Sequence, residues 1–486
     1  MTSVLHDVVI RDGTVVTAER SFRCDVGIRN GKVVEMKTGL TGSRTIDASG
    51  KLVLPGGVDS HCHIEQLSSM GVMGADDFYS ATVSAAHGGT TTVIPFCAQH
   101  RGDSLAQQLA DYHQRARAKS VIDYGFHLII ANPDQPTLER DLPAAIASGV
   151  RSFKIFMTYE RMRLHDEQIL DVMAVARKHG ALMMVHAENH GMISWLTGRM
   201  VKQGNTLPRY HAICHTRGSE AEAIGRIVAL GELMDCPLLV VHVSTPEGIE
   251  AIRQARARGL KVFGETCPQY LFLTAKDIDI GLAGAMYCCS PPPRDEAAQA
   301  ACWQGLKDGT LAVYSSDHAP YRMDASGKLP KGDETTFKEM ANGVPGLELR
   351  LPLLFGYGYK AGRLSIQEFV NLTASAHARI YGLYPRKGTI EVGSDADLAI
   401  WDPEKRVTIE ATRDNTGYTP YKGRALTGWP VTVISRGEII VEDGNLHAER
   451  GRGRFLAREP SDALVPLGRD VPEMAQLKSW NTPLAL

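Results

Sequence analysis

The sequence has no long apolar run, no excess of one charge and no regular cysteine spacing, and each absence excludes a class of protein. No apolar run approaches the length that crosses a bilayer, so we expect no membrane span. The 53 basic and 55 acidic residues are interspersed and leave a net charge of −2, which argues against nucleic acid or an anionic membrane as a partner. The first residues, MTSVLHDVVIRDG, lack the apolar core of a signal peptide.

The nine cysteines are scattered along the chain, and none of them forms a CxxC pair. An odd number of cysteines without a pairing pattern fits reduced thiols, so we expect a cytoplasmic protein. Hydrophobic residues make up 43% of the chain and charged residues 22%, the ordinary balance of a globular enzyme. No fixed-period repeat or low-complexity tract interrupts this composition.

Residues 56–385 alternate between apolar, strand-like runs and helical stretches such as SLAQQLADYHQRARAK. Eight of the runs are apolar almost throughout, as parallel strands buried on both faces should be. Eight strand–helix units over this length predict an α/β fold, a TIM-type (β/α)8 barrel. The eight runs are GGVDSHCHI, TTTVIPFCA, DYGFHLII, SFKIFMTY, ALMMVHAEN, PLLVVHVST, KVFGETCPQY and LAVYSSDHAP.

The two ends of the chain have a different texture, with short alternating strands and turns rich in Gly and Asp. It is found in residues 1–55, for example DVVIRDGTVV, and again in residues 386–447, for example GWPVTVISRGEIIVEDGNL. We expect these two segments to pack together as one small β-sandwich domain, each supplying the face that the other lacks. The tail, residues 448–486, is rich in Arg and Pro and is a candidate arm for contact with a neighbouring subunit.

Polar residues of metal-ligand type stand at the ends of several predicted barrel strands. In a barrel the carboxyl ends of all strands open onto one face, so residues far apart in sequence converge there. His61 and His63 are two apart, so on a strand they point the same way, as a chelating pair can. Imidazole and carboxylate groups suit zinc and similar divalent ions. The candidate ligands are His61, His63, Lys154, His186, His242 and Asp317.

A single histidine at a strand end is more often structural than a ligand, and most of the 17 histidines are interpreted in that way. His127 within GFHLII is expected in the core, and His179 before Gly180 at a helix end. Cys62 is expected to face away from its two histidine neighbours. The coincidence of such residues at five strand ends is what favours a metal site.

Lys154 lies inside an apolar strand run, where an unpaired lysine is rarely buried. A protonated amine would be repelled by two divalent cations and cannot be their ligand. A lysine that has reacted with CO₂ becomes a carbamate, an anion with two oxygens that can bridge two metals. The alternative is a lysine whose amine reaches the barrel rim, which fits a metal-free mouth better.

As a set and in this order, the motifs PGGVDSHCH, SFKIFMTY, VHAEN, VHVS, ETCPQY, CSPPPR, SSDHAP, NGVPGLELR and KGTIEVGSDADLAIWD resemble the dihydropyrimidinase/hydantoinase branch of the cyclic amidohydrolases. The resemblance covers nearly the whole chain. It implies two zinc ions, a carboxylated Lys154 that bridges them, a small-molecule substrate and a homotetramer. It assigns His61, His63 and Asp317 to one ion, and His186 and His242 to the other.

The resemblance also implies a mechanism. A hydroxide between the two ions would attack a ring amide carbonyl of a dihydropyrimidine or 5-substituted hydantoin, and the ring would open to an N-carbamoyl amino acid. Tyr159 would polarise the carbonyl, and the backbone at Ser290 and Asn342 would hold the ring amides. Asp317 would take the hydroxide's proton and pass it to the leaving nitrogen.

Other functions stay open at this stage. Allantoinase and cyclic-imide hydrolase would use nearly the same centre. Related chains that have lost their metal ligands serve as non-catalytic scaffold proteins, but here all six positions hold ligand-capable residues.

The chain departs from the family pattern in two segments, IEQLSSMGVM and YERMRLHD, which lie where the family shapes its substrate gate. Leu67, Met70 and Met162 are predicted to form an apolar gate for an alkyl or aryl substituent. Dihydroorotase, a cousin on the same barrel, usually has an arginine where this chain has Glu65. We expect Glu65 to face the substrate and repel a carboxylate there, or else to turn outward onto the rim. Neutral rings are the expected substrates in either case, with a preference for D-hydantoins.

Overall fold

The computed structural model describes residues 6–480 and 482. Its centre is a ring of parallel strands made of two hydrogen-bonded runs, one of three strands and one of seven. A parallel bridge between Cys62 and His318 closes the ring between the first and last strands. The strands are β8 (Gly57–Asp59), β9 (Thr90–Val93), β10 (Phe96–Ala98), β11 (Asp123–Tyr124), β12 (His127–Ile129), β13 (Ser152–Phe156), β14 (Leu182–His186), β15 (Leu238–Val240), β16 (Val262–Thr266) and β17 (Leu311–Tyr314). The predicted eight-stranded barrel is confirmed.

Two of the eight predicted strands are each divided into two short strands. Pro95 separates β9 from β10, because proline has no N–H to donate to the ladder. Gly125 lies between β11 and β12, directly after Tyr124, whose backbone forms hydrogen bonds with Arg454 and Leu456 of the C-terminal segment. The ladder resumes after each break, so the ring keeps its order.

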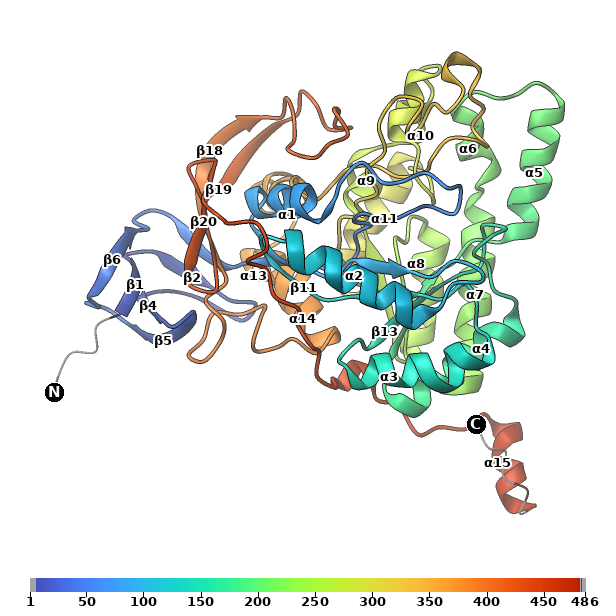
Figure 1. The fold of residues 1–486 in the computed structure, drawn as a ribbon, viewed down its shortest axis with the longest axis horizontal. Helices are drawn as coiled ribbons and strands as arrows, with labels where there is room; N and C mark the ends of the chain where they lie inside the picture. The colour runs from blue at the N-terminus through green and yellow to red at the C-terminus, as the bar shows by residue number, and fades with distance from the viewer. Residues whose placement is uncertain (1–5, 481, 483–486) are drawn as a thin grey trace.

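Helices surround the barrel strands, as Figure 1 shows. On α7, Ile224, Ile227 and Val228 recur at helical spacing and are buried in the same core as Val185 and Val240 of the strands. The helices are α1 (Phe78–His87), α2 (Leu105–Lys119), α3 (Leu142–Ala147), α4 (Asp166–His179), α5 (His190–Lys202), α6 (Arg209–Cys214), α7 (Arg217–Met234), α8 (Pro246–Ala257), α9 (Pro268–Phe272), α10 (Ala275–Ile278), α11 (Glu296–Lys307), α12 (Arg350–Leu354), α13 (Ile366–Val370), α14 (Ala376–Ile380) and α15 (Pro472–Ser479). Within residues 6–480, none of the helices has both the length and the apolar character needed to cross a membrane.

Strands from both ends of the chain form two further sheets at one side of the barrel (Figure 1). One sheet has four strands: β1 (His6–Arg11), β4 (Asp25–Arg29), β5 (Lys32–Lys37) and β6 (Gly42–Asp47). The other has seven strands: β2 (Thr14–Val16), β3 (Ser21–Arg23), β7 (Leu52–Pro55), β18 (Leu398–Thr408), β19 (Ala425–Ser435), β20 (Glu438–Glu442) and β21 (Asn445–Leu446). β7 and β18 pair directly, and both sheets contribute side chains to one apolar core, including Val26, Val53 and Ile400. This arrangement supports the predicted sandwich, whereas its limits at 1–55 and 386–447 stay a prediction.

The tail after Ala448 first packs against its own barrel. Leu456 N–H donates to the carbonyl of Tyr124, and the buried Arg458 donates to Ser152 Oγ and to the carbonyl of Phe126. These partners lie at the amino-terminal ends of the strands, so this part of the tail covers the floor of the barrel. Within the described part of the tail, α15 projects away from the rest of the molecule (Figure 1).

Candidate metal centre

All six predicted ligands lie at the carboxyl-terminal face of the barrel. His61 and His63 follow β8, Lys154 lies in β13, His186 ends β14, and His242 and Asp317 follow β15 and β17. Asp317 Oδ1 lies 3.1 Å from His61 Nε2 and 3.5 Å from His63 Nε2. One ligand atom from each of these three residues lies within 4.8 Å of the other two, a spacing that one metal ion can span. The structure therefore brings together residues that are more than 250 positions apart.

The other three candidates lie beside this group. Lys154 is buried, and its Nζ is 2.9 Å from His61 Nε2. The ring centroid of His242 lies 5.5 Å from that of His61 and 4.5 Å from that of His186. His242 therefore lies between His61 and His186, the candidate ligands of the two proposed ions.

Three polar side chains each contact one ring nitrogen of a candidate histidine. His61 Nδ1 is 2.5 Å from Glu265 Oε1, and His63 Nδ1 is 2.8 Å from Gln66 Oε1. His186 Nε2 is 2.8 Å from Glu188 Oε2. A partner on one nitrogen selects the tautomer and leaves the other nitrogen available to a metal.

Our sequence reasoning missed these three partners. Glu188 carried a usable signal, because it follows His186 by two residues and two-residue spacing keeps side chains on one side of an extended chain. Glu265 also lies within a predicted strand run, KVFGETCPQY, but its position gave no indication of which histidine it would meet.

His242 provides an independent indication that the centre is built for a cation. Both of its ring nitrogens are buried, and neither has a hydrogen-bond partner among the described residues. Buried polar atoms in folded proteins nearly always have a partner, and a neutral imidazole is the commonest metal ligand. Burial and the neighbouring His186 hold the pKa of His242 well below its ordinary value, which keeps the ring neutral. The residues present therefore fit a metal.

The pKa values of the other candidate ligands are also shifted from their ordinary values. Burial lowers the pKa of His63 to about 4 and also lowers that of His186, so both rings are neutral near pH 7. Burial opposes the charge of Asp317, but His61 beside it holds the pKa of the carboxyl well below its usual range. Burial lowers the pKa of Lys154 to about 8, although the carboxylates of Asp317 and Glu265 act in the other direction.

Three site residues occupy the left-handed backbone region, which residues other than glycine rarely adopt. The φ angles are 67° at Tyr159, 43° at His242 and 47° at Asp317. Each lies just after a barrel strand, where the chain leaves the sheet. Such backbone strain tends to persist where the surrounding structure needs a side chain in one particular position.

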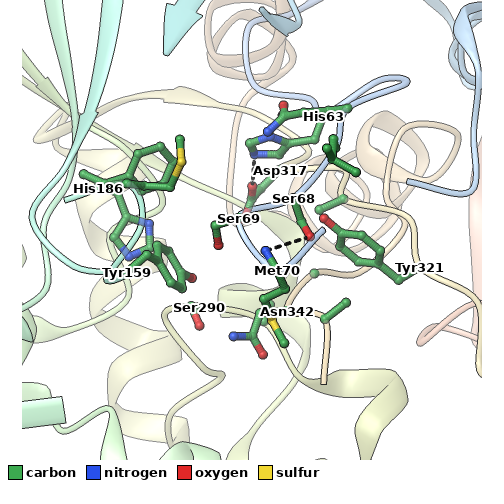
Figure 2. Close-up of a pocket in the computed structure, with 18 of the residues that line it drawn as sticks. His63, Ser68, Ser69, Met70, Tyr159, His186, Ser290, Asp317, Tyr321 and Asn342 are labelled. Atoms are coloured by element: carbon green, nitrogen blue, oxygen red, sulfur yellow. Dashed lines mark hydrogen bonds and ion pairs between the residues drawn. The ribbon is translucent and has the colours of Figure 1, made fainter. Parts of the chain in front are cut away.

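A pocket opens directly onto these ligands, and Figure 2 shows Asp317 facing it beneath His63. Tyr159, Ser290 and Asn342, the predicted substrate contacts, line this pocket. So do the predicted gate residues: Leu67 and Met70 are each 40% exposed at the mouth, while Met162 is buried. Burial raises the pKa of Tyr159, so its hydroxyl remains a donor at neutral pH.

The prediction that Glu65 faces the substrate is wrong. Its carboxylate accepts hydrogen bonds from Lys119 Nζ at 2.8 and 2.9 Å, and it is not among the residues that line the pocket. The side chain is only 17% exposed, so it does not simply extend into solvent either. The ion pair between Glu65 and Lys119 joins the loop after β8 to the end of α2.

Comparisons with known proteins agree with this geometry. The model of the amidohydrolase family matches residues 52–440. D-hydantoinases from Ralstonia pickettii and Geobacillus stearothermophilus are each 40% identical, over 93% and 96% of this chain and 99% of their own. The crystal structure of dihydropyrimidinase from Brevibacillus agri NCHU1002 superposes with a TM-score of 0.90 at 38% identity, covering 93% of this chain and 99% of that one.

Proposed function

The chain belongs to the amidohydrolase family, in the branch of the D-hydantoinases and dihydropyrimidinases, and we propose that it opens dihydropyrimidine or 5-substituted hydantoin rings to N-carbamoyl amino acids. It is a hydrolase of cyclic amides. The observation that carries the substrate proposal is the convergence of six ligand-type residues beside a pocket whose gate is apolar. An apolar gate suits the alkyl or aryl substituent of such a ring.

Two divalent cations, zinc by resemblance, are the proposed cofactors. His61, His63 and Asp317 would hold one ion, and His186 and His242 the other. Lys154 would bridge them after its amine adds to CO₂ and releases a proton. Such ions lower the pKa of a water molecule and polarise a carbonyl group.

The acid–base step is proposed for Asp317. Its Oδ1 faces His61 and His63, and its Oδ2 accepts a hydrogen bond from Gln269 Nε2 at 3.1 Å, which fixes the plane of the carboxylate. A carboxylate held ionised can accept the proton of the attacking water and then deliver it to the ring nitrogen that leaves.

Tyr159 is the proposed donor to the developing oxyanion. Its hydroxyl stays protonated, and the left-handed backbone at this residue directs the ring into the pocket. Charge appears on the carbonyl oxygen only as the ring amide is attacked, so a donor placed there favours the transition state over the ground state. The backbone at Ser290 and Asn342 would hold the ring amides at the other side of the pocket.

A substrate panel tests the proposal. We expect the zinc-loaded protein to hydrolyse dihydrouracil and 5-substituted D-hydantoins faster than allantoin, succinimide or dihydroorotate. Dihydroorotate carries its carboxylate on the ring, and the lining of the pocket offers that anion no arginine. Faster turnover of allantoin or succinimide than of any hydantoin would instead assign one of the two alternative activities.

We also propose a cytoplasmic homotetramer. All nine cysteines are free thiols and eight of them are buried, which agrees with a reducing compartment. The projecting helix α15 offers a segment for contact between subunits (Figure 1). Light scattering on the full chain tests the assembly.

A further inference from the structure

A larger, outer cavity adjoins the substrate pocket, and no step of the proposed reaction uses it. The outer cavity encloses about 500 Å³, against about 100 Å³ for the pocket at the metal ligands. Ser69, Met70, Tyr159 and Asn342 line both spaces, so the two meet at these residues. A substituent that leaves the ring between Tyr159 and Met70 would enter the outer cavity.

The inner wall of the outer cavity is partly apolar. Ile193 of α5 and Phe337 of the loop before Asn342 line the cavity and are both buried. These side chains can contact the methylene groups of an arm that passes through. The apolar gate residue Met70 continues this lining toward the ring site.

Two cations at the cavity have no anionic partner. Arg161 and Lys338 line it from different loops, and among the described residues neither forms an ion pair with a carboxylate. Arg161 Nη1 donates only to the carbonyl of Ser69, at 3.4 Å. Exposed cations are common, but two unpaired ones that converge on one cavity beside a substrate pocket constitute an anion-recognition feature.

The acidic group that lines the cavity does not cancel these charges. Glu160 is the acidic side chain in the lining, and its carboxylate lies 2.9 Å from His190 Nε2 and 3.6 Å from Arg163 Nε. Its negative charge is therefore matched by Arg163 and not by Arg161 or Lys338. The cavity keeps a positive balance.

We propose that the outer cavity binds the anionic end of a substrate's side arm, so that the substrate class includes hydantoins whose 5-substituent is an alkyl chain ending in a carboxylate. This inference rests on the proposed hydrolysis of hydantoins. The ring lies at the metal ligands, the methylene groups pass Met70 toward Ile193 and Phe337, and the carboxylate meets Arg161 and Lys338. A carboxylate fixed directly to the ring cannot reach these cations and stays in the inner pocket.

Matched substrates test the inference. The zinc-loaded protein is assayed with 5-(2-carboxyethyl)hydantoin, with its neutral isostere 5-(2-carbamoylethyl)hydantoin and with the cationic 5-(4-aminobutyl)hydantoin. We expect kcat/KM for the acid to exceed that for the amide by about tenfold at low salt, and the amine to be the poorest of the three. The advantage of the acid should shrink as the ionic strength rises.

Variants locate the effect. In Arg161→Gln/Lys338→Gln the acid-to-amide ratio of kcat/KM is expected to fall to about one. The control, Arg199→Gln/Lys276→Gln, removes the same charge from exposed residues that do not line the cavity, and it should keep the wild-type ratio. A ratio near one in the wild type, or an unchanged ratio in the first variant, overturns the inference while turnover of the amide leaves the proposed function standing. No turnover of any hydantoin also overturns the inference, and a lack of turnover of dihydrouracil in addition would overturn the proposed function.

Discussion

At the scale of single residues, the candidate metal centre contains a buried amine, Lys154, in a position where a charged side chain is rarely found. Lys154 is a buried amine, 1% exposed, with a histidine nitrogen at 2.9 Å and the ring of Phe96 4.2 Å below its Nζ. Neither neighbour is an anion that would explain a buried ammonium. A carbamate at this position would turn a cation that repels metals into an anion that bridges them.

Lys154→Ala should therefore fold and lose its second metal ion and nearly all turnover. Among the described residues that line the pocket Asp317 is the one carboxylate, and it is assigned to the first ion, so no second carboxylate there can replace the bridge. Metal analysis by mass spectrometry and a hydantoin assay measure the two losses, and a small carboxylic acid added with zinc should restore a trace of activity. The exposed Lys276→Ala serves as the control. Full activity with two ions in Lys154→Ala would contradict the carbamate.

Asp317→Asn should keep metal on His186 and His242 and lose turnover by about 10²–10⁴-fold. The amide keeps the size of the carboxylate but cannot accept a proton. Turnover measured across a pH series, with metal content determined on the same samples, separates the loss of the base from the loss of an ion. Wild-type rates at any pH in that series would remove Asp317 from the acid–base step.

Glu65 shows where sequence reasoning fails at this scale. Two-residue spacing after His63 places Glu65 on the side of the ligands as long as the chain stays extended. The backbone instead turns left-handed at Glu65, with φ of 49°, and the side chain swings to Lys119. The periodicity of side chains predicts directions within a strand, but the torsion of a loop residue depends on contacts made by distant segments.

At the scale of elements, a buried lysine joins the two loops that carry the proposed substrate contacts. Lys328 Nζ donates to the carbonyl of Cys288 at 2.8 Å and to that of Ala341 at 3.1 Å. These carbonyls lie close to Ser290 and next to Asn342, the two proposed backbone contacts. Sequence analysis did not identify Lys328, since nothing in a loop lysine indicates which carbonyls it will meet.

Lys328→Met should raise KM by about tenfold or more while the metal content stays at the wild-type value. Methionine fills the space of the aliphatic stem but leaves both carbonyls without their donor, so the two loops lose their fixed spacing. The exposed Lys331→Met, three residues away, is the matched control. A parallel loss of metal would show that Lys328 supports the whole barrel mouth and not the substrate contacts in particular.

The strands illustrate what periodicity can predict. Continuous apolar runs identified all eight barrel strands, because parallel strands buried on both faces need apolar side chains at every position. The same signal did not reveal the breaks at Pro95 and Gly125, since apolar content continues across them. Polar residues at the strand ends identified candidate ligands, which the structure brings together, but their partners Glu265 and Gln66 became evident only from the folded barrel.

At the scale of the whole molecule, a buried ion cluster joins the barrel to the sandwich. Lys387 Nζ lies 2.8 Å from Asp123 of β11, 3.1 Å from Asp395 and 2.5 Å from Asp397, just before β18. The sequence predicted that the two terminal segments pack together, but composition could not show how they attach to the barrel. Attachment depends on charges that are more than 260 residues apart.

Lys387→Met should destabilise the fold by about 3–5 kcal/mol, because it leaves three carboxylates close together without their shared cation.

Asp395 adds a dependence on pH: Lys387, acting against burial, contributes to lowering its pKa to about 2, below the value near 4 of an unfolded aspartate. A depressed folded pKa stabilises the protein above pH 4, and this contribution is lost as the pH falls from 4 toward 2. The free energy of unfolding measured in urea should therefore fall steeply for the wild type between pH 4 and pH 2. For the variant the same quantity should fall less steeply. Equal slopes in the two proteins would mean that the cluster does not link the two parts of the molecule energetically.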